Sequence, residues 1–247
     1  MGQADSCPMG GNIMMQAVIM AGGKGTRLAA LTKDEIPKPM VPVAGKPLLL
    51  WQVERLKENG ITDIIMVIGH LGDKIKEYFG DGEKFGVAIR YYEETEPLGT
   101  AGSFYYLKDM IHGERFVMMS GDLFFDIDFQ RMIRFHEEKG AVATLFVHPN
   151  GHPFDSDLLV LDKDDKITAF DSKHNVRDYW YKNCVNAGIF VFEKKICDYV
   201  PEPVKRNLEN DVIKGMLEAG ADLWILLSGV CEGCRNCGPC KPGTGGY

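Results

Sequence analysis

The chain has 247 residues, of which 45% are hydrophobic and 26% are charged, and its net charge is −7. This composition supplies enough apolar material for one large core. The acidic balance argues against a nucleic-acid partner, because counterion release requires clustered Lys and Arg side chains. No apolar run approaches the ~18 residues of a membrane span, and no basic segment precedes an apolar one near residue 1. Cys184 and Cys197 lie in apolar surroundings typical of reduced core thiols. Together these features predict a cytoplasmic protein without a membrane partner.

Strand and helix signals alternate along the first half of the chain, after residues 1–14, which we expect to form a disordered leader. Short β-rich apolar runs predict strands, and a period of 3.6 residues predicts helices. The expected strands are 16–20, 61–68, 87–92 and 116–120, and the expected helices are 47–59, 73–79, 101–109 and 129–139. This alternation predicts βαβ units, a mostly parallel sheet and ligands at the carboxyl ends of the strands.

The second half of the chain is richer in strands. Apolar runs predict strands at 142–147, 158–161, 167–170 and 185–192, and a helix returns at 208–218. We expect one domain over 15–227 with two lobes, a nucleotide lobe over about 15–140 and a mixed-sheet lobe over about 141–227 that covers it as a lid. We expect residues 228–247 to be a non-native or disordered Cys-rich tail.

The most informative segment for function is AGGKGTRL at 21–28, directly after the first expected strand. A glycine-rich turn lets backbone N–H groups approach a ligand closely, because no Cβ stands in the way. Its spacing fits neither the dinucleotide fingerprint nor the Walker loop. Arg27 offers a planar fork for two phosphate oxygens, and Lys38, between Pro37 and Pro39, offers a mobile point charge. The pattern favours a bound polyphosphate; the alternatives are an ordinary tight turn and two surface salt bridges.

Asp122 follows the apolar run 116–119 and the pair Ser120-Gly121. A carboxylate at the end of a buried parallel strand is either a helix cap or a metal ligand. Mg²⁺ prefers one or two carboxylates together with phosphate oxygens. From the residues alone, both alternatives stay open.

The sequence GGxGTRL followed by PKP resembles the signature of sugar-1-phosphate nucleotidylyltransferases, and is most similar to the heptose-1-phosphate and mannose-1-phosphate guanylyltransferase group. The resemblance extends over about residues 15–224. It implies an α/β fold of the nucleotide-diphospho-sugar transferase type, with a Rossmann-like, mostly parallel sheet flanked by helices and a smaller mixed-sheet sugar-binding lobe. It also implies an enzyme that uses Mg²⁺. A sugar 1-phosphate attacks the α-phosphorus of a nucleoside triphosphate, with GTP favoured, and gives a nucleotide sugar and pyrophosphate. The resemblance leaves open whether the chain forms a homo-oligomer.

The resemblance also implies roles for individual residues. Thr100 could instead cap its own helix, and Lys173 stands in the context DSKH rather than the family's Glu-Lys-Pro. The expected catalytic residues are Arg27, Lys38 and Asp122, with Asp122 also the metal ligand; the expected nucleotide-binding residues are Ala21, Gly22, Gly23, Gly25, Thr26, Gly99 and Thr100; the expected sugar-phosphate-binding residues are Lys173, Asn186 and Gly188.

Cys231, Cys234, Cys237 and Cys240 form a CxxCxxCxxC tail, a spacing that suits an iron–sulfur or zinc site. The resembled family instead continues with a stretch of the type SPEYVKDVGT. Back-translation of 228–238 with permitted codons, read one nucleotide downstream, yields Pro-Glu-Tyr-Val-Lys-Asp-Val-Gly-Thr-Val. We therefore hypothesise that the reading frame slips near 224–228. A true metal cluster and a plain disordered tail are the alternatives.

The hypothesis has a chemical consequence. In the resembled family the Asp of DVGT is the second Mg²⁺ ligand, and here Gly233-Cys234 takes its place. We expect weaker Mg²⁺ binding and slow turnover. Two competing functions follow from the same features: a non-catalytic nucleotide or sugar-phosphate binding protein on the same fold, and an iron–sulfur or zinc protein.

Overall fold

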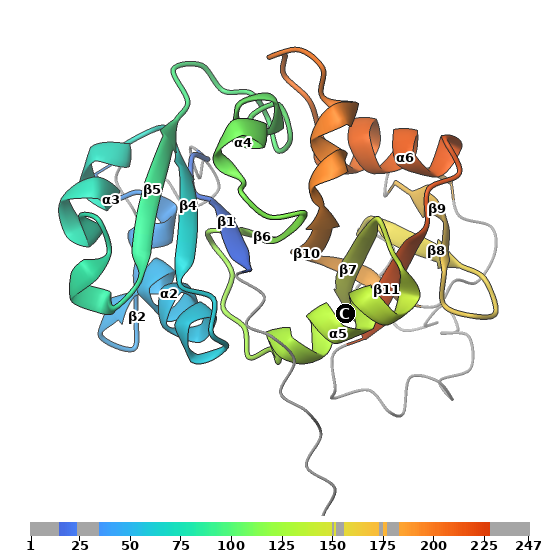
Figure 1. Cartoon of the computed structure of the whole chain (residues 1–247), viewed down its shortest axis with the longest axis horizontal. Coiled ribbons are helices and arrows are strands. Elements are labelled where there is room, and N and C mark those ends of the chain that lie inside the picture. Colours follow the sequence, from blue (N-terminus) through green and yellow to red (C-terminus); the bar gives the residue numbers. More distant parts are fainter. Residues whose placement is uncertain are drawn as a thin grey trace, which may run out of the picture.

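The computed structural model describes residues 15–23, 35–149, 151, 156–172, 175–176 and 183–227. Strands and helices alternate through the first half, as the sequence predicts (Figure 1). The elements are β1 (Gln16–Met20), η2 (Lys38–Met40), β2 (Pro42–Val43), β3 (Lys46–Pro47), α2 (Leu48–Glu58), β4 (Asp63–Ile68), α3 (Gly72–Phe79), η3 (Glu83–Phe85), β5 (Ala88–Glu93), α4 (Phe104–Met110), β6 (Arg115–Ser120), α5 (Phe129–Lys139), β7 (Ala143–His148), β8 (Leu158–Leu161), β9 (Ile167–Asp171), β10 (Val185–Glu193), η5 (Lys194–Tyr199), η6 (Leu208–Ile213), α6 (Lys214–Glu218) and β11 (Leu223–Leu227).

Within the described residues, the main sheet has nine strands, seven of them in the order β11-β7-β10-β6-β1-β4-β5. Neighbouring pairs among β6, β1, β4 and β5 are parallel, and only β10 runs against its neighbours β6 and β7 along this path. The hairpin β8–β9 branches from β10. The mostly parallel α/β sheet that the sequence predicts is confirmed.

The strand order reverses direction at β1. The chain passes from β1 to β4 and β5 on one side, and then returns to β6 on the other side of β1. The register places Met20, Val67 and Ser120 level with one another at the carboxyl ends of β1, β4 and β6. Open α/β sheets bind ligands in the crevice outside such a switch point. The topology therefore predicts a ligand site at the residues that follow Met20.

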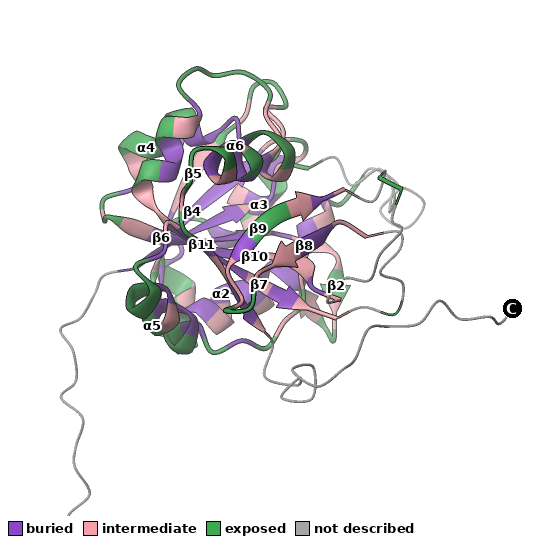
Figure 2. Cartoon of the chain, turned by 90° about the vertical axis from the view of Figure 1, so that its right-hand side faces the viewer, coloured by how far each residue is buried: buried purple, intermediate pink, exposed green. Residues whose placement is uncertain are grey.

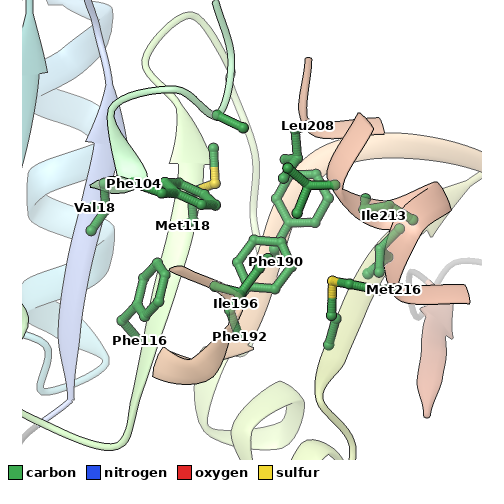
Figure 3. Close-up of a cluster of buried hydrophobic side chains, with 14 of the residues drawn as sticks. Val18, Phe104, Phe116, Met118, Phe190, Phe192, Ile196, Leu208, Ile213 and Met216 are labelled. Atoms are coloured by element: carbon green, nitrogen blue, oxygen red, sulfur yellow. The ribbon is translucent and has the colours of Figure 1, made fainter. Parts of the chain in front are cut away.

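Helices cover both faces of the sheet (Figure 2). α4, η5, η6 and α6 pack on one face with Val18, while α2, α3 and α5 pack on the other with Ala17 and Ile19. Successive residues of a strand point to opposite faces, so a strand buried on both sides reads as an unbroken apolar run. Figure 3 shows the first of these clusters, where Phe104, Phe116 and Phe192 meet. No helix in the described part of the chain is both long and apolar enough to cross a membrane.

The second half differs in arrangement from the expected lid. β7, β10 and β11 continue the central sheet beside β6, so these strands form no separate sheet, and β8–β9 is the part that leaves it. β11 was not expected from the sequence; it pairs in parallel with β7. The expected helix over 208–218 is present, with π-helical geometry over Leu208–Ile213 before α6. The lobe boundaries stay a prediction, and 1–14 and 228–247 lie outside the described residues.

Candidate active site

A cavity of about 740 Å³, here called the central cavity, opens where β1, β4, β5 and β6 end. Its volume falls in the range of about 300–1,000 Å³ typical of small-molecule sites. It is lined by Met20, Ala21, Gly22, Gly23, Lys38, Pro39, Gly69, His70, Glu94, Thr95, Pro97, Gly99, Thr100, Ser120 and Asp122. Each of these strands contributes its own last residue or the residues just beyond it, which is the arrangement expected at a switch point.

The start of the glycine-rich segment packs tightly against the turn after β4. Ala21 N donates to Val67 O at 2.7 Å, which extends the parallel ladder by one residue. A Cβ at Gly22 would lie 3.1 Å from Glu94 Oε2 and 3.2 Å from Gly69 N. Gly22 therefore lets three chain segments meet without a side chain between them. Ala21, Gly22 and Gly23 all line the central cavity.

Lys38 reaches the central cavity from η2. Pro37 has φ −62° at the N-cap, and Pro39 has no backbone N–H to satisfy, so both prolines suit the start of a short helix. Met40 N donates to Pro37 O at 2.7 Å and closes the turn. Lys38 Nζ donates to Asp122 Oδ2, and the two side chains are 32% and 31% exposed. The chain thus brings together a cation and a carboxylate that lie far apart in sequence.

Asp122 stands in the turn that follows β6. Gly121 N donates to Met20 O at 2.8 Å, so this turn is tied to the end of β1. The pairing of Asp122 with Lys38 differs from the helix-cap alternative. The residue that caps α5 is Asp128, whose Oδ1 accepts from Arg131 N at 2.9 Å. Asp122 lines the central cavity, and among the described residues its carboxylate pairs with the Lys38 ammonium group.

The opposite wall is a loop held by a second segment of the chain. Gly99 has φ +78° and forms an isolated bridge with Arg206. Ala101 N donates to Arg206 O at 3.1 Å, and Arg206 N donates to Leu98 O at 3.0 Å. Thr100 Oγ1 accepts from Leu208 N at 2.7 Å, so it satisfies the first N–H of η6 rather than capping its own helix. Gly99 and Thr100 both line the central cavity.

Glu94 is a lining residue that the sequence analysis did not single out. It follows β5, and its backbone N–H donates to Ile68 O at 2.8 Å. Burial raises the pKa of its carboxyl to about 7, opposed by a hydrogen bond from the backbone of Leu98. Its Oε1 is buried and has no hydrogen-bond partner in the described structure. The available signal was its place as a polar residue just past a parallel strand, a place that His70 shares after β4.

Of the predicted sugar-phosphate residues, Asn186 and Gly188 are described, and neither lines the central cavity itself. Asn186 Oδ1 accepts from Gly188 N at 3.0 Å, and Asn186 Nδ2 donates to Glu209 Oε1 at 3.3 Å. Gly188 has φ +75°, and a Cβ there would lie 3.3 Å from Ser120 Oγ, so it abuts the strand that leads to Asp122. Four predicted residues lie outside the described residues: Gly25, Thr26, Arg27 and Lys173.

The described side chains near the central cavity can be compared with the ligands that the expected Mg²⁺ requires. The described residues contain no group of three or more His, Cys, Asp and Glu side chains that could hold a metal ion by themselves. Mg²⁺ is commonly held by one or two carboxylates with substrate phosphates completing its shell. Asp122 supplies one such carboxylate at the wall of a cavity large enough for a nucleotide. The arrangement fits Mg²⁺ that arrives with its phosphates, and does not fit a metal bound by protein groups alone.

Comparison with known proteins agrees with this architecture. The sequence model of the family described as nucleotidyl transferase matches residues 16–225, so the chain belongs to the nucleotidyl transferase family. It is 32% identical over 225 residues to the UTP–glucose-1-phosphate uridylyltransferase of Synechocystis, covering 86% of this chain and 58% of that protein. It is 35% identical over 203 residues to probable mannose-1-phosphate guanylyltransferase 1 of Oryza sativa subsp. japonica, covering 80% and 55%.

A solved structure shows the same fold. HddC from Yersinia pseudotuberculosis, complexed with GMP-PN, superposes with a TM-score of 0.73 at 25% identity, over 87% of this chain and 91% of that one. The chain therefore spans most of this structure, but little more than half the length of the two curated relatives. The family and fold expected from the glycine-rich segment are confirmed.

Proposed function

We propose that this chain transfers a nucleotidyl group from a nucleoside triphosphate to a sugar 1-phosphate, forming a nucleotide sugar and pyrophosphate. The observation that carries the proposal is the Lys38–Asp122 pair in the wall of the central cavity. A cation for phosphate and a carboxylate for a metal meet there, beside the backbone of Gly22 and Gly23. The family match and the printed activities of the two curated relatives support it.

The chemistry asks little of a base, because the attacking phosphate oxygen is already anionic. That oxygen forms a bond to the α-phosphorus while the bond from the α-phosphorus to the bridging oxygen of pyrophosphate breaks, and the electron pair leaves with pyrophosphate. The task is to bring anions together in line. Lys38 would bind the triphosphate and the charge that develops on pyrophosphate, with Arg27 proposed beside it. Mg²⁺, held by Asp122, would supply further charge neutralisation when bound.

We propose GTP as the nucleotide, and Glu94 as the feature of the central cavity that favours it. Guanine presents adjacent N–H donors on one edge, and a carboxylate can accept from both. Glu94 lines the central cavity, and its carboxyl group is the acceptor that we assign to these N–H donors. The guanylyltransferase relative and the nucleotide of the HddC complex point the same way, whereas the Synechocystis relative is a uridylyltransferase.

The direct test is pyrophosphate release with a panel of triphosphates and sugar 1-phosphates. Lys38→Met should lower the rate by about 10²–10³, the usual cost of one electrostatic contact to the transition state. Lys46→Met is the matched control, because Lys46 is also partly exposed and ion-paired, with Glu54, yet does not line the central cavity. Glu94→Gln should reduce the preference for GTP over UTP. Triphosphate binding without pyrophosphate release under any combination would instead indicate a non-catalytic binding protein.

A further inference from the structure

A buried glutamine connects α2 to the turn that carries Asp122. Gln52 is 1% exposed, and its Nε2 donates to Ser120 O at 3.0 Å and to Leu123 O at 2.7 Å. These two carbonyls flank Gly121 and Asp122 on either side. Both amide hydrogens of one side chain therefore hold the two ends of the turn.

The orientation of this amide is fixed by its partners. Both are carbonyl oxygens, which only accept, so the NH₂ group must face them. Gln52 Oε1 is left buried without a partner in the described structure. An unpaired buried carbonyl is unfavourable, and an apolar residue of similar size would avoid it. What such a residue could not provide is the pair of donors to the Asp122 turn.

The turn needs these donors because it has little regular structure of its own. Residues 121–128, between β6 and α5, belong to no helix or strand. The same face of α2 also contacts the end of this segment and the start of α5. Arg55 pairs with Asp126 at 3.4 Å, and Asn59, the C-cap of α2, accepts through Oδ1 from Phe129 N at 3.0 Å. Positions 52, 55 and 59 share one helix face. Of these three residues, Gln52 is the one whose two hydrogen bonds lie on either side of Asp122.

The same helix also holds the segment that carries Lys38. α2 begins directly after the β2–β3 hairpin, and Leu48 N donates to Val41 O at 3.0 Å. Trp51 Nε1 donates to Val43 O at 2.9 Å. α2 is thus the shared support of both partners in the Lys38–Asp122 pair.

We propose that Gln52 is a positioning residue that sets the place of the Asp122 carboxylate for the metal–triphosphate complex. The inference rests on the proposed function, because it takes Asp122 as the metal ligand. Groups that orient a metal ligand typically contribute about 10–100-fold to metal affinity. Gln52 would act through two backbone carbonyls, without touching substrate or metal.

The test uses Mn²⁺ as the probe and electron paramagnetic resonance as the readout, with a non-hydrolysable GTP analogue present. Gln52→Met removes both donors at similar volume. Gln16→Met is the matched control: Gln16 is 2% exposed and also bonds twice, to Asp63 Oδ2 at 2.7 Å and from His112 N at 2.6 Å, but at the opposite end of β1. We expect Gln52→Met to weaken Mn²⁺ binding by about 10–100-fold and to leave metal-free analogue binding little changed. Gln16→Met should leave both affinities little changed.

Gln52→Glu provides a second, graded test that does not depend on the Met variant folding. A protonated carboxyl keeps one donor, and an ionised carboxylate keeps none and repels both carbonyls. Mn²⁺ affinity of this variant should fall as pH rises, relative to the wild type. A Gln52→Glu pH profile parallel to the wild type, or equal loss in Gln52→Met and Gln16→Met, overturns the inference alone. A wild-type chain that binds no analogue and no Mn²⁺ overturns the proposed function together with it.

Discussion

Replacing Gly99 by alanine should destabilise the chain more than a typical glycine substitution at positive φ. Gly99 has φ +78°, and a Cβ there would lie 2.3 Å from Arg206 O and 3.1 Å from its carbonyl carbon. Both atoms belong to backbone, so the clash cannot be relieved by moving a side chain. The Arg206 segment must shift away from the loop that forms one wall of the central cavity.

The magnitude follows from two contributions. A left-handed backbone costs a residue with a Cβ about 1–2 kcal/mol. The shift would also weaken the bonds Ala101 N–Arg206 O and Arg206 N–Leu98 O, at 3.1 and 3.0 Å, each contributing about 0.5–1.5 kcal/mol. We therefore expect Gly99→Ala to lower the free energy of unfolding by about 2–5 kcal/mol.

Urea denaturation measures this loss, with Gly60→Ala as the control. Gly60 has φ +79°, and a Cβ there would meet nothing within 4 Å, so it isolates the backbone contribution of about 1–2 kcal/mol. Gly99→Ala should also weaken triphosphate binding, because its loop lines the central cavity. Equal losses of stability in the two variants would refute the reasoning, since the contact with Arg206 would then have no measurable cost.

Two further predictions concern Glu94 and the tail. Burial raises the pKa of Glu94 from 4.5 to about 7, so between these pH values the folded chain keeps a proton that the unfolded chain has released. The wild type should therefore lose stability relative to Glu94→Gln as pH rises from about 4.5 to 7. A difference in melting temperature between the two proteins that is constant with pH would contradict this prediction. Replacing residues 229–238 by Pro-Glu-Tyr-Val-Lys-Asp-Val-Gly-Thr-Val should raise the rate of pyrophosphate release, because it restores the second carboxylate of the resembled family. Equal rates in the two versions would show that the Cys-rich tail does not limit activity.

Local sequence patterns were sufficient to predict most of the helices and strands. α5 matches its expected range because Asp128 caps its first turn, and Gly140, with φ +57°, ends it. β1 and β8 also match, since each is a short apolar run. β11 was not predicted, although Leu223–Leu227 is also a short apolar run. The parallel pairing of β11 with β7 joins segments far apart in the sequence, and no local pattern predicts it.

Motifs in the sequence singled out Lys38, Asp122 and the glycine-rich segment. Lys38, Asp122 and residues 21–23, the described start of that segment, line one cavity, but their roles stay predictions. The ion pair between Lys38 and Asp122 depends on the register of β1 against β6. Gln52 and Glu94 were not predicted as site residues because their significance depends on burial. Each has a buried oxygen without a partner in the described structure. A sequence does not reveal which polar side chains will be cut off from water.

The most direct test of the account is calorimetric titration of the chain with GTP in the presence of Mg²⁺. We predict saturable binding at one site, weakened about tenfold or more in Lys38→Met, since a hydrogen bond to a charged group contributes about 1.5–3 kcal/mol. Absence of binding heat for GTP and every other ribonucleoside triphosphate, with folded protein, would contradict it.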